Sequence, residues 1–90
     1  MLREGVERLA VVLPVQRAVL FGSYAKGNYT VASDVDLLVV YRGQARDDAY
    51  AVTKRTLNIP ELEPHLYTEA EYEALAPTLE RMTAGGVVLR

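Results

Sequence analysis

The sequence contains no cysteine and no tryptophan, and it has only one histidine and one phenylalanine. Without cysteine the chain can form no disulfide and can bind no metal through thiolates, which suits a cytoplasmic protein and excludes a disulfide-stabilised scaffold. An excess of positive charge is also missing, because 10 Lys and Arg residues stand against 12 Asp and Glu residues. With a net charge of −2, no basic surface is expected to bind nucleic acid.

The N-terminus lacks a long uninterrupted hydrophobic run. Its apolar residues instead recur at the spacing of one helix face: Leu2, Val6, Leu9 and Leu13. Charged residues fill the positions between them, so the segment predicts an amphipathic helix that ends before Pro14, not a signal peptide or a membrane span. Ninety residues, half of them apolar, are expected to form a single domain over 1–90.

The stretch 19–40, VLFGSYAKGNYTVASDVDLLVV, carries the candidate chemistry. One apolar run ends at Gly22, and a second carries Asp34 and Asp36 at its entry. Side chains two apart on a strand point to the same face, so these carboxylates are expected to lie roughly 6.5–7 Å apart. Carboxylates this close repel each other unless a cation lies between them or one is protonated. Opposite a turn rich in backbone N–H donors, they indicate a magnesium site beside a phosphate site.

The turn after the first apolar run is the predicted phosphate site. Gly22 lets the backbone approach a phosphate closely, and the Ser23 hydroxyl can donate to a phosphate oxygen. Residues 23–26 are expected to begin a short helix whose N–H groups attract an anion. Lys26 can pair with a phosphate as a point charge, and Ser33 can orient the acidic pair. The plain alternative is a turn with a serine N-cap and a solvated lysine.

The two motifs together, G-S-x-x-x-G and S-D-x-D-L, resemble the signature of the DNA polymerase β-like nucleotidyltransferase superfamily. Within it, the chain resembles the minimal, stand-alone MNT group, which is often paired with HEPN proteins in prokaryotic toxin–antitoxin modules. The residues that carry the resemblance are Gly22, Ser23, Gly27, Ser33, Asp34, Asp36 and Leu37. It implies an α/β (α+β) fold, with a short mixed β-sheet, helices mainly on one face and a cleft on the other. The family often has arginine at the positions of Tyr24 and Lys26, where this chain has none.

The resemblance also implies a third carboxylate, on a strand beside the one with the aspartates, that binds metal or acts as a general base. Residues 59–67 predict this strand, with Glu61, Glu63 and His65 on one of its faces. Glu63 is the candidate and Glu61 the runner-up, although the family usually has aspartate here. Pro64 confines the strand to a sheet edge or an irregular place. His65 is expected to be an ordinary surface or satisfied residue before it is a ligand or base, because imidazole matches magnesium's preference for oxygen poorly.

Further elements are expected on either side of that strand. Residues 46–57 predict a helix, with Ala45, Ala49 and Val52 turned inward. Thr68 and Glu71 have the spacing of a capping box, which opens another helix. Residues 87–89 predict a short last strand.

The resemblance implies the transfer of a nucleoside monophosphate, AMP from ATP, to a hydroxyl. Asp34, Asp36 and Glu63 would hold one or two Mg²⁺ ions, and Gly22 and Ser23 would hold the β and γ phosphates of ATP. In the MNT–HEPN pairs the acceptor is a tyrosine of the toxin. The resemblance therefore implies an antitoxin that silences a HEPN-type toxin by AMPylation, in a homo- or hetero-oligomer.

Two other functions stay open at this point. The chain can be a non-catalytic antitoxin or regulatory subunit that neutralises its partner by contact. It can also be a nucleotidyltransferase for a small molecule, such as an aminoglycoside, completed by a second subunit.

Overall fold

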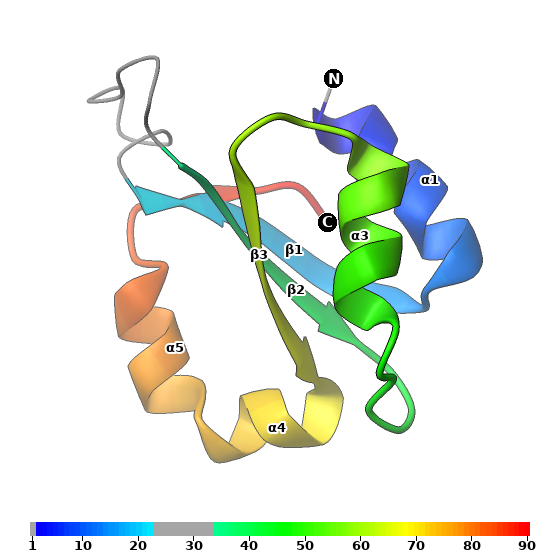
Figure 1. Cartoon of the computed structure of the whole chain (residues 1–90). Coiled ribbons are helices and arrows are strands. Elements are labelled where there is room, and N and C mark those ends of the chain that lie inside the picture. The colour runs from blue at the N-terminus through cyan, green and yellow to red at the C-terminus, as the bar shows by residue number, and fades with distance from the viewer. Residues whose placement is uncertain (1, 23–33) are drawn as a thin grey trace.

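The computed structural model describes residues 2–22 and 34–90. Within these residues one four-stranded mixed sheet has the strand order β3-β2-β1-β4 (Figure 1). The elements in chain order are α1 Leu2–Val12, β1 Val15–Phe21, β2 Val35–Tyr41, α3 Ala49–Leu57, β3 Leu62–Thr68, α4 Glu69–Ala74, α5 Ala76–Met82 and β4 Val87–Val88. β1 runs antiparallel to β2 and β4, whereas β2 and β3 are parallel. The predicted fold class is confirmed, and β3, which contains Pro64, lies at a sheet edge.

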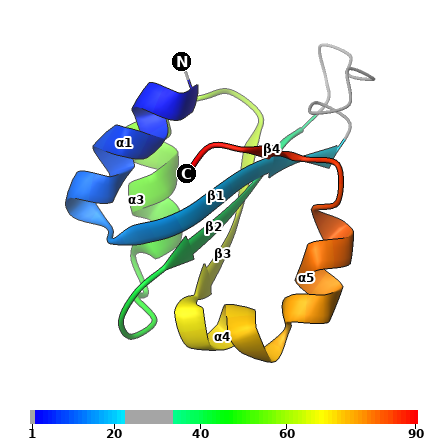
Figure 2. The same cartoon turned by 180° about the vertical axis from the view of Figure 1, so that it is seen from behind.

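The two longest helices, α1 and α3, lie together over one face of the sheet (Figure 2). The main hydrophobic core fills the space between them and the strands, with α1 contributing Val6 and Leu9, and Leu13 joining it directly after the helix. Leu37 and Val39 of β2 point into this core, as the alternation of side chains along a strand requires. The amphipathic helix predicted before Pro14 is therefore confirmed. No helix in the described part of the chain is long and apolar enough to span a membrane.

The opposite face of the sheet carries a smaller apolar cluster formed by Val19, Phe21, Leu38 and Val40. Tyr67 of β3 and Tyr72 of α4 pack against it. The helix α4 begins at a capping box, because Glu71 N donates to Thr68 Oγ1 at 3.2 Å and Thr68 N donates to Glu71 Oε1 at 2.8 Å. The capping box predicted from the sequence is confirmed.

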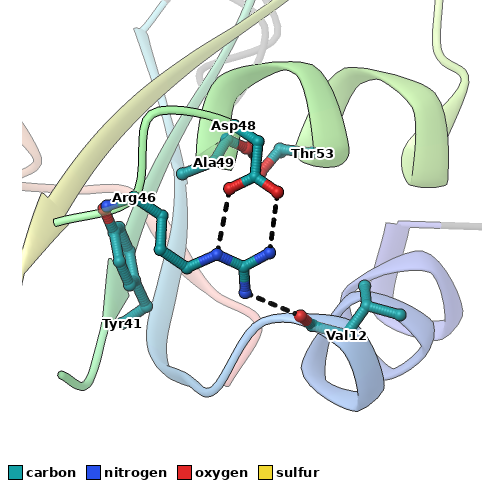
Figure 3. A network of polar contacts seen from close by, with 6 residues as sticks. All are labelled: Val12, Tyr41, Arg46, Asp48, Ala49 and Thr53. Atoms are coloured by element: carbon teal, nitrogen blue, oxygen red, sulfur yellow. Dashed lines mark hydrogen bonds and ion pairs between the residues drawn. The ribbon is translucent and has the colours of Figure 1, made fainter. Parts of the chain in front are cut away.

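The helix predicted over 46–57 begins later, at Ala49, and Ala45 is exposed instead of turned inward. Arg46 accounts for the difference (Figure 3). Its guanidinium donates to both carboxylate oxygens of Asp48, at 3.0 and 2.9 Å, and to Val12 O at 2.9 Å. Asp48 is the N-cap residue, but its carboxylate makes no capping hydrogen bond, since Arg46 binds it. The contact ties the end of α1 to the start of α3.

The strand predicted over 59–67 also begins later, at Leu62. A turn precedes it, in which Leu62 N donates to Ile59 O at 3.2 Å and Glu61 has a positive φ of 64°. A residue in this left-handed conformation cannot continue an extended strand. The last strand, predicted over 87–89, is confined to Val87–Val88.

Candidate active site

Asp36 lies where three strands meet at one end of the sheet. It is the second residue of β2 and pairs with Phe21, the last residue of β1, in the antiparallel ladder. On its other side it pairs with Glu63 of β3 in the parallel ladder. Residues paired across a ladder have side chains on the same face, so Glu63 projects on the Asp36 side of the sheet. The predicted proximity of Asp36 and Glu63 is thus supported by the strand register.

The two oxygens of the Asp36 carboxylate have different surroundings. Oδ1 lies 3.2 Å from Nε2 of His65, and the Asp36 side chain keeps 27% of its surface exposed. Oδ2 lies on the side of Gly22: a Cβ atom placed on Gly22 would be 2.5 Å from it. Gly22 also has a positive φ of 82°, which glycine adopts without steric cost. Glycine at this position therefore leaves the space in which the Asp36 carboxylate stands.

Glu63 and Glu61, the two candidates for the third carboxylate, occupy unlike positions. Glu63 lies within β3, and its side chain is exposed. Glu61 precedes the strand in the turn, and its carbonyl accepts a hydrogen bond from Val35 N at 2.8 Å. Lys54 of α3 fixes the start of β3, since its Nζ donates to Leu62 O at 2.7 Å. The backbone contacts thus hold Glu63 in register with β2 and give Glu61 a place in the turn.

The other predicted site residues have no described contact with Asp36, Glu63 or His65. Asp34 is exposed and directly precedes β2. Ser23, Lys26 and Ser33 lie outside the described residues, so their predicted roles stay predictions. Within residues 2–22 and 34–90, no three acidic or histidine side chains converge into a metal-binding group. Among the described residues, Asp36 and His65 are in contact and Glu63 is adjacent in the ladder, while Asp34 stands apart at the strand entry.

The residues present nevertheless fit a magnesium ion. Asp34, Asp36 and Glu63 offer carboxylate oxygens, the hard ligands that Mg²⁺ prefers. Glycine at position 22 also leaves room beside Oδ2 of Asp36, in the space that a Cβ atom would fill. This oxygen is therefore not covered by a side chain at position 22.

His65 is a candidate to which the sequence assigned only a minor role. It was expected to be an ordinary surface or satisfied residue, and its ring does find partners, because it contacts both Asp36 and Phe21. The Phe21 and His65 ring centroids are 5.1 Å apart with the planes tilted by 58°. The signal available in the sequence was the shared face of Glu63 and His65, but without the strand register nothing connected that face to Asp36.

A second feature of this face is a hollow of about 330 Å³, lined by Gln16, Arg17, Val40, Glu69, Tyr72 and Glu73. Arg17 pairs with Val40 near the far end of the ladder, whereas Phe21 pairs with Asp36. Four residues of strand separate the two places, which corresponds to about 13 Å. The hollow is thus distinct from the carboxylate group.

The fold and the carboxylates together define a class: a small α+β domain with an acidic site at the entry of a central strand, beside a glycine that ends the neighbouring strand. The chain belongs to the family described as "Nucleotidyltransferase domain", whose model matches residues 1–84. It is also 54% identical over 26 residues to the "Putative protein adenylyltransferase MJ0604" of Methanocaldococcus jannaschii. That match covers 29% of this chain and only 26% of the relative.

Two solved structures share the fold. A crystal structure described as a "putative nucleotidyltransferase" from Sulfolobus solfataricus aligns with a TM-score of 0.64 and 23% identity, covering 97% of this chain and 74% of its own. A chain of a mutant of the toxin–antitoxin complex MntA-HpeT aligns with a TM-score of 0.66 and 16% identity, covering 98% of this chain and 72% of its own. At these identities the likeness shows a common fold.

Proposed function

We propose that this chain is a Mg²⁺-dependent nucleotidyltransferase that transfers AMP from ATP to a tyrosine hydroxyl of a partner HEPN-type toxin in the cytoplasm. Membership of the nucleotidyltransferase family supports the reaction class. The observation that carries the proposal is the position of Asp36, whose carboxylate stands against Gly22 and beside Glu63. This is the combination of acidic ligands and open backbone that a metal-bound triphosphate requires.

Each of the proposed site residues would have a separate role in the reaction. Asp34 and Asp36 would bind the ion through carboxylate oxygens, and the backbone at Gly22 and Ser23 would bind the β and γ phosphates. Bound Mg²⁺ supplies neutralising charge on the triphosphate. The acceptor hydroxyl oxygen attacks the α-phosphorus, the bond to the β-phosphate oxygen breaks and pyrophosphate leaves. The exposed Glu63 carboxylate would take the hydroxyl proton, or bind the ion as a third ligand.

A protein acceptor is favoured by two observations. The relative from Methanocaldococcus jannaschii is named as an adenylyltransferase of proteins, and one structural neighbour is part of a toxin–antitoxin complex. The chain itself is small and has a net charge of −2, whereas a domain that binds nucleic acid is more often basic. A partner protein would then supply both the acceptor hydroxyl and part of the surface around it.

The runner-up is a non-catalytic antitoxin that neutralises its partner by binding alone. It is favoured by the third carboxylate being a glutamate at an exposed edge-strand position, where the family usually has aspartate. In this case Asp36 would serve the fold or sense a nucleotide without chemistry.

The test is intact-mass spectrometry of the co-purified partner before and after incubation with Mg-ATP. A gain of one or more adenylyl masses is expected with the wild-type chain and none with Asp36→Asn. Asp47→Asn is the matched control, because it removes the same charge from an exposed loop beyond the far end of β2. A stable complex without any mass gain in the wild type would contradict the proposal and support the runner-up.

A further inference from the structure

We propose that His65 is a positioning residue for Asp36: its Nε2–H donates to Oδ1 and thereby holds Oδ2 on the Gly22 side, toward the ion and the phosphates. The inference rests on the proposed function, because it concerns the presentation of a metal-binding carboxylate. It assigns a role to a side chain on the edge strand that carries the candidate third carboxylate.

The first step is the contact itself. His65 Nε2 and Asp36 Oδ1 are 3.2 Å apart, within hydrogen-bond distance. Asp36 and His65 lie on neighbouring strands. In the β2–β3 ladder His65 pairs with Leu38, which is two residues beyond Asp36 along β2. A carboxylate can only accept, so the neutral ring makes this hydrogen bond as the tautomer with its proton on Nε2.

The second step is that the His65 ring is itself held in place. It packs against the Phe21 ring, and Phe21 is 7% exposed within the apolar cluster of this face. Phe21 is also the residue paired with Asp36 across the β1–β2 ladder. Phe21, Asp36 and His65 thus lie on three adjacent strands, where His65 contacts both of the others and Phe21 pairs with Asp36 in the ladder. Packing against Phe21 restricts the rotation of the His65 ring that donates to Asp36.

The third step is the position of the other carboxylate oxygen. Oδ2 stands in the space that a Cβ atom on Gly22 would occupy. With Oδ1 bound by His65 from β3 and Oδ2 lying toward the end of β1, the carboxylate has a defined orientation. Hydrogen-bond partners behind metal-binding side chains fix the ligand orientation and raise affinity for the ion.

The alternative explanation is that the hydrogen bond between His65 and Asp36 only stabilises the fold. The two side chains keep 36% and 27% of their surfaces exposed, and hydrogen-bonded pairs this accessible to water contribute little to stability. The contact is therefore expected to affect ion binding far more than folding.

The experiment measures Mn²⁺ binding to the full chain by titration calorimetry, together with the melting temperature. His65→Phe keeps the ring against Phe21 and removes the donor, whereas His65→Gln keeps an N–H donor at similar reach and removes the ring. His65→Phe is expected to bind Mn²⁺ about 10- to 100-fold more weakly at an unchanged melting temperature, and His65→Gln to retain most of the affinity. Wild-type affinity in His65→Phe would overturn the inference. Equal losses in both variants would also overturn it, since the imidazole and not the hydrogen bond would then be needed.

A second readout separates this inference from the proposed function. The ¹⁵N chemical shifts of His65 in slightly alkaline, metal-free buffer report which ring nitrogen carries the proton. Protonation on Nε2 is expected in the wild type, and protonation on Nδ1 would overturn the positioning role while leaving the proposed transferase untouched. Identical Mn²⁺ binding by wild type and Asp36→Asn would instead overturn the metal role of Asp36 on which both proposals depend.

Discussion

Asp36 on β2 and Glu63 on β3 are partners in the parallel ladder, and their side chains leave the same face of the sheet one strand apart. Neighbouring strands lie about 4.7–4.9 Å apart, so the two carboxylates can share a ligand between them. Glu61, in contrast, lies in the turn before β3 with a positive φ of 64°. This relationship favours Glu63 over Glu61 as the proposed third carboxylate.

Replacing Glu63 with Gln is therefore expected to lower the rate of AMP transfer by at least about 10², the usual contribution of a general base. Glu61→Gln is the control, since it makes the same change two residues away. Rates of partner labelling with Mg-ATP, measured under single-turnover conditions, check the prediction. A slow Glu61→Gln enzyme beside a fast Glu63→Gln enzyme would reverse the assignment.

Replacing Gly22 with Ala is expected to destabilise the fold and to abolish transfer. A non-glycine residue at its φ of 82° costs about 1–2 kcal/mol, and the new Cβ would press on Asp36 Oδ2. Gly43→Ala is a matched control, because Gly43 has a φ of 94° and a Cβ there would meet no atom within 4 Å. Urea unfolding of both variants separates the two effects. A free energy of unfolding for Gly22→Ala no lower than that for Gly43→Ala would show that the Asp36 contact is unimportant.

The Arg46–Asp48 pair is expected to make stability depend on pH in acid. The hydrogen bond from Arg46 lowers the pKa of Asp48 below its ordinary value of 3.8, and the same bond raises the pKa of Arg46. Because the folded pKa of Asp48 is the lower one, its stabilisation is present above pH 3.8 and is lost as the pH falls through the folded value. Both groups are exposed, so the effect is small.

Melting temperatures of wild type and Asp48→Asn should therefore differ at neutral pH and converge in acid. Asp47→Asn provides the neighbouring control, which should show no such convergence. A constant difference between Asp48→Asn and wild type across this pH range would contradict the ion-pair explanation.

Replacing Glu61 with Gly is expected to stabilise the protein by about 0.5–1 kcal/mol. Glycine relieves the cost of the positive φ, and its greater freedom in the unfolded chain offsets part of that gain. The midpoint of urea unfolding should rise, and the rate of AMP transfer should not change. A lower midpoint would mean that the Glu61 side chain contributes contacts that outweigh its backbone strain.

Much of the fold could be predicted because its signals are local. Alternation along 35–41 fixed which side chains of β2 face each apolar cluster, and the helical spacing of residues 2–13 placed α1. The capping box of Thr68 and Glu71 depends on residues three apart and formed as expected. Pro64, which cannot donate to a ladder, limited its strand to an edge or an irregular place, and β3 lies at the edge.

The errors arose where distant contacts override local preference. Helix propensity alone could not show that Arg46 turns back to bind Val12 O and Asp48, which delays the start of α3. In the same way, the turn at Glu61, with its positive φ of 64°, delays the start of β3 until Leu62.

For the site, the sequence by itself determined the residue types: a glycine that ends one strand, two aspartates at the entry of the next and acidic residues two apart before Pro64. These follow from side-chain chemistry and from the two-residue period of a strand. Only the tertiary structure decided which of them meet. The register of β2 against β3 places Glu63 beside Asp36 and brings His65 within 3.2 Å of its carboxylate. Register between strands joined by a long connection depends on how the apolar faces of both strands are buried together, which the pattern of one strand alone does not show.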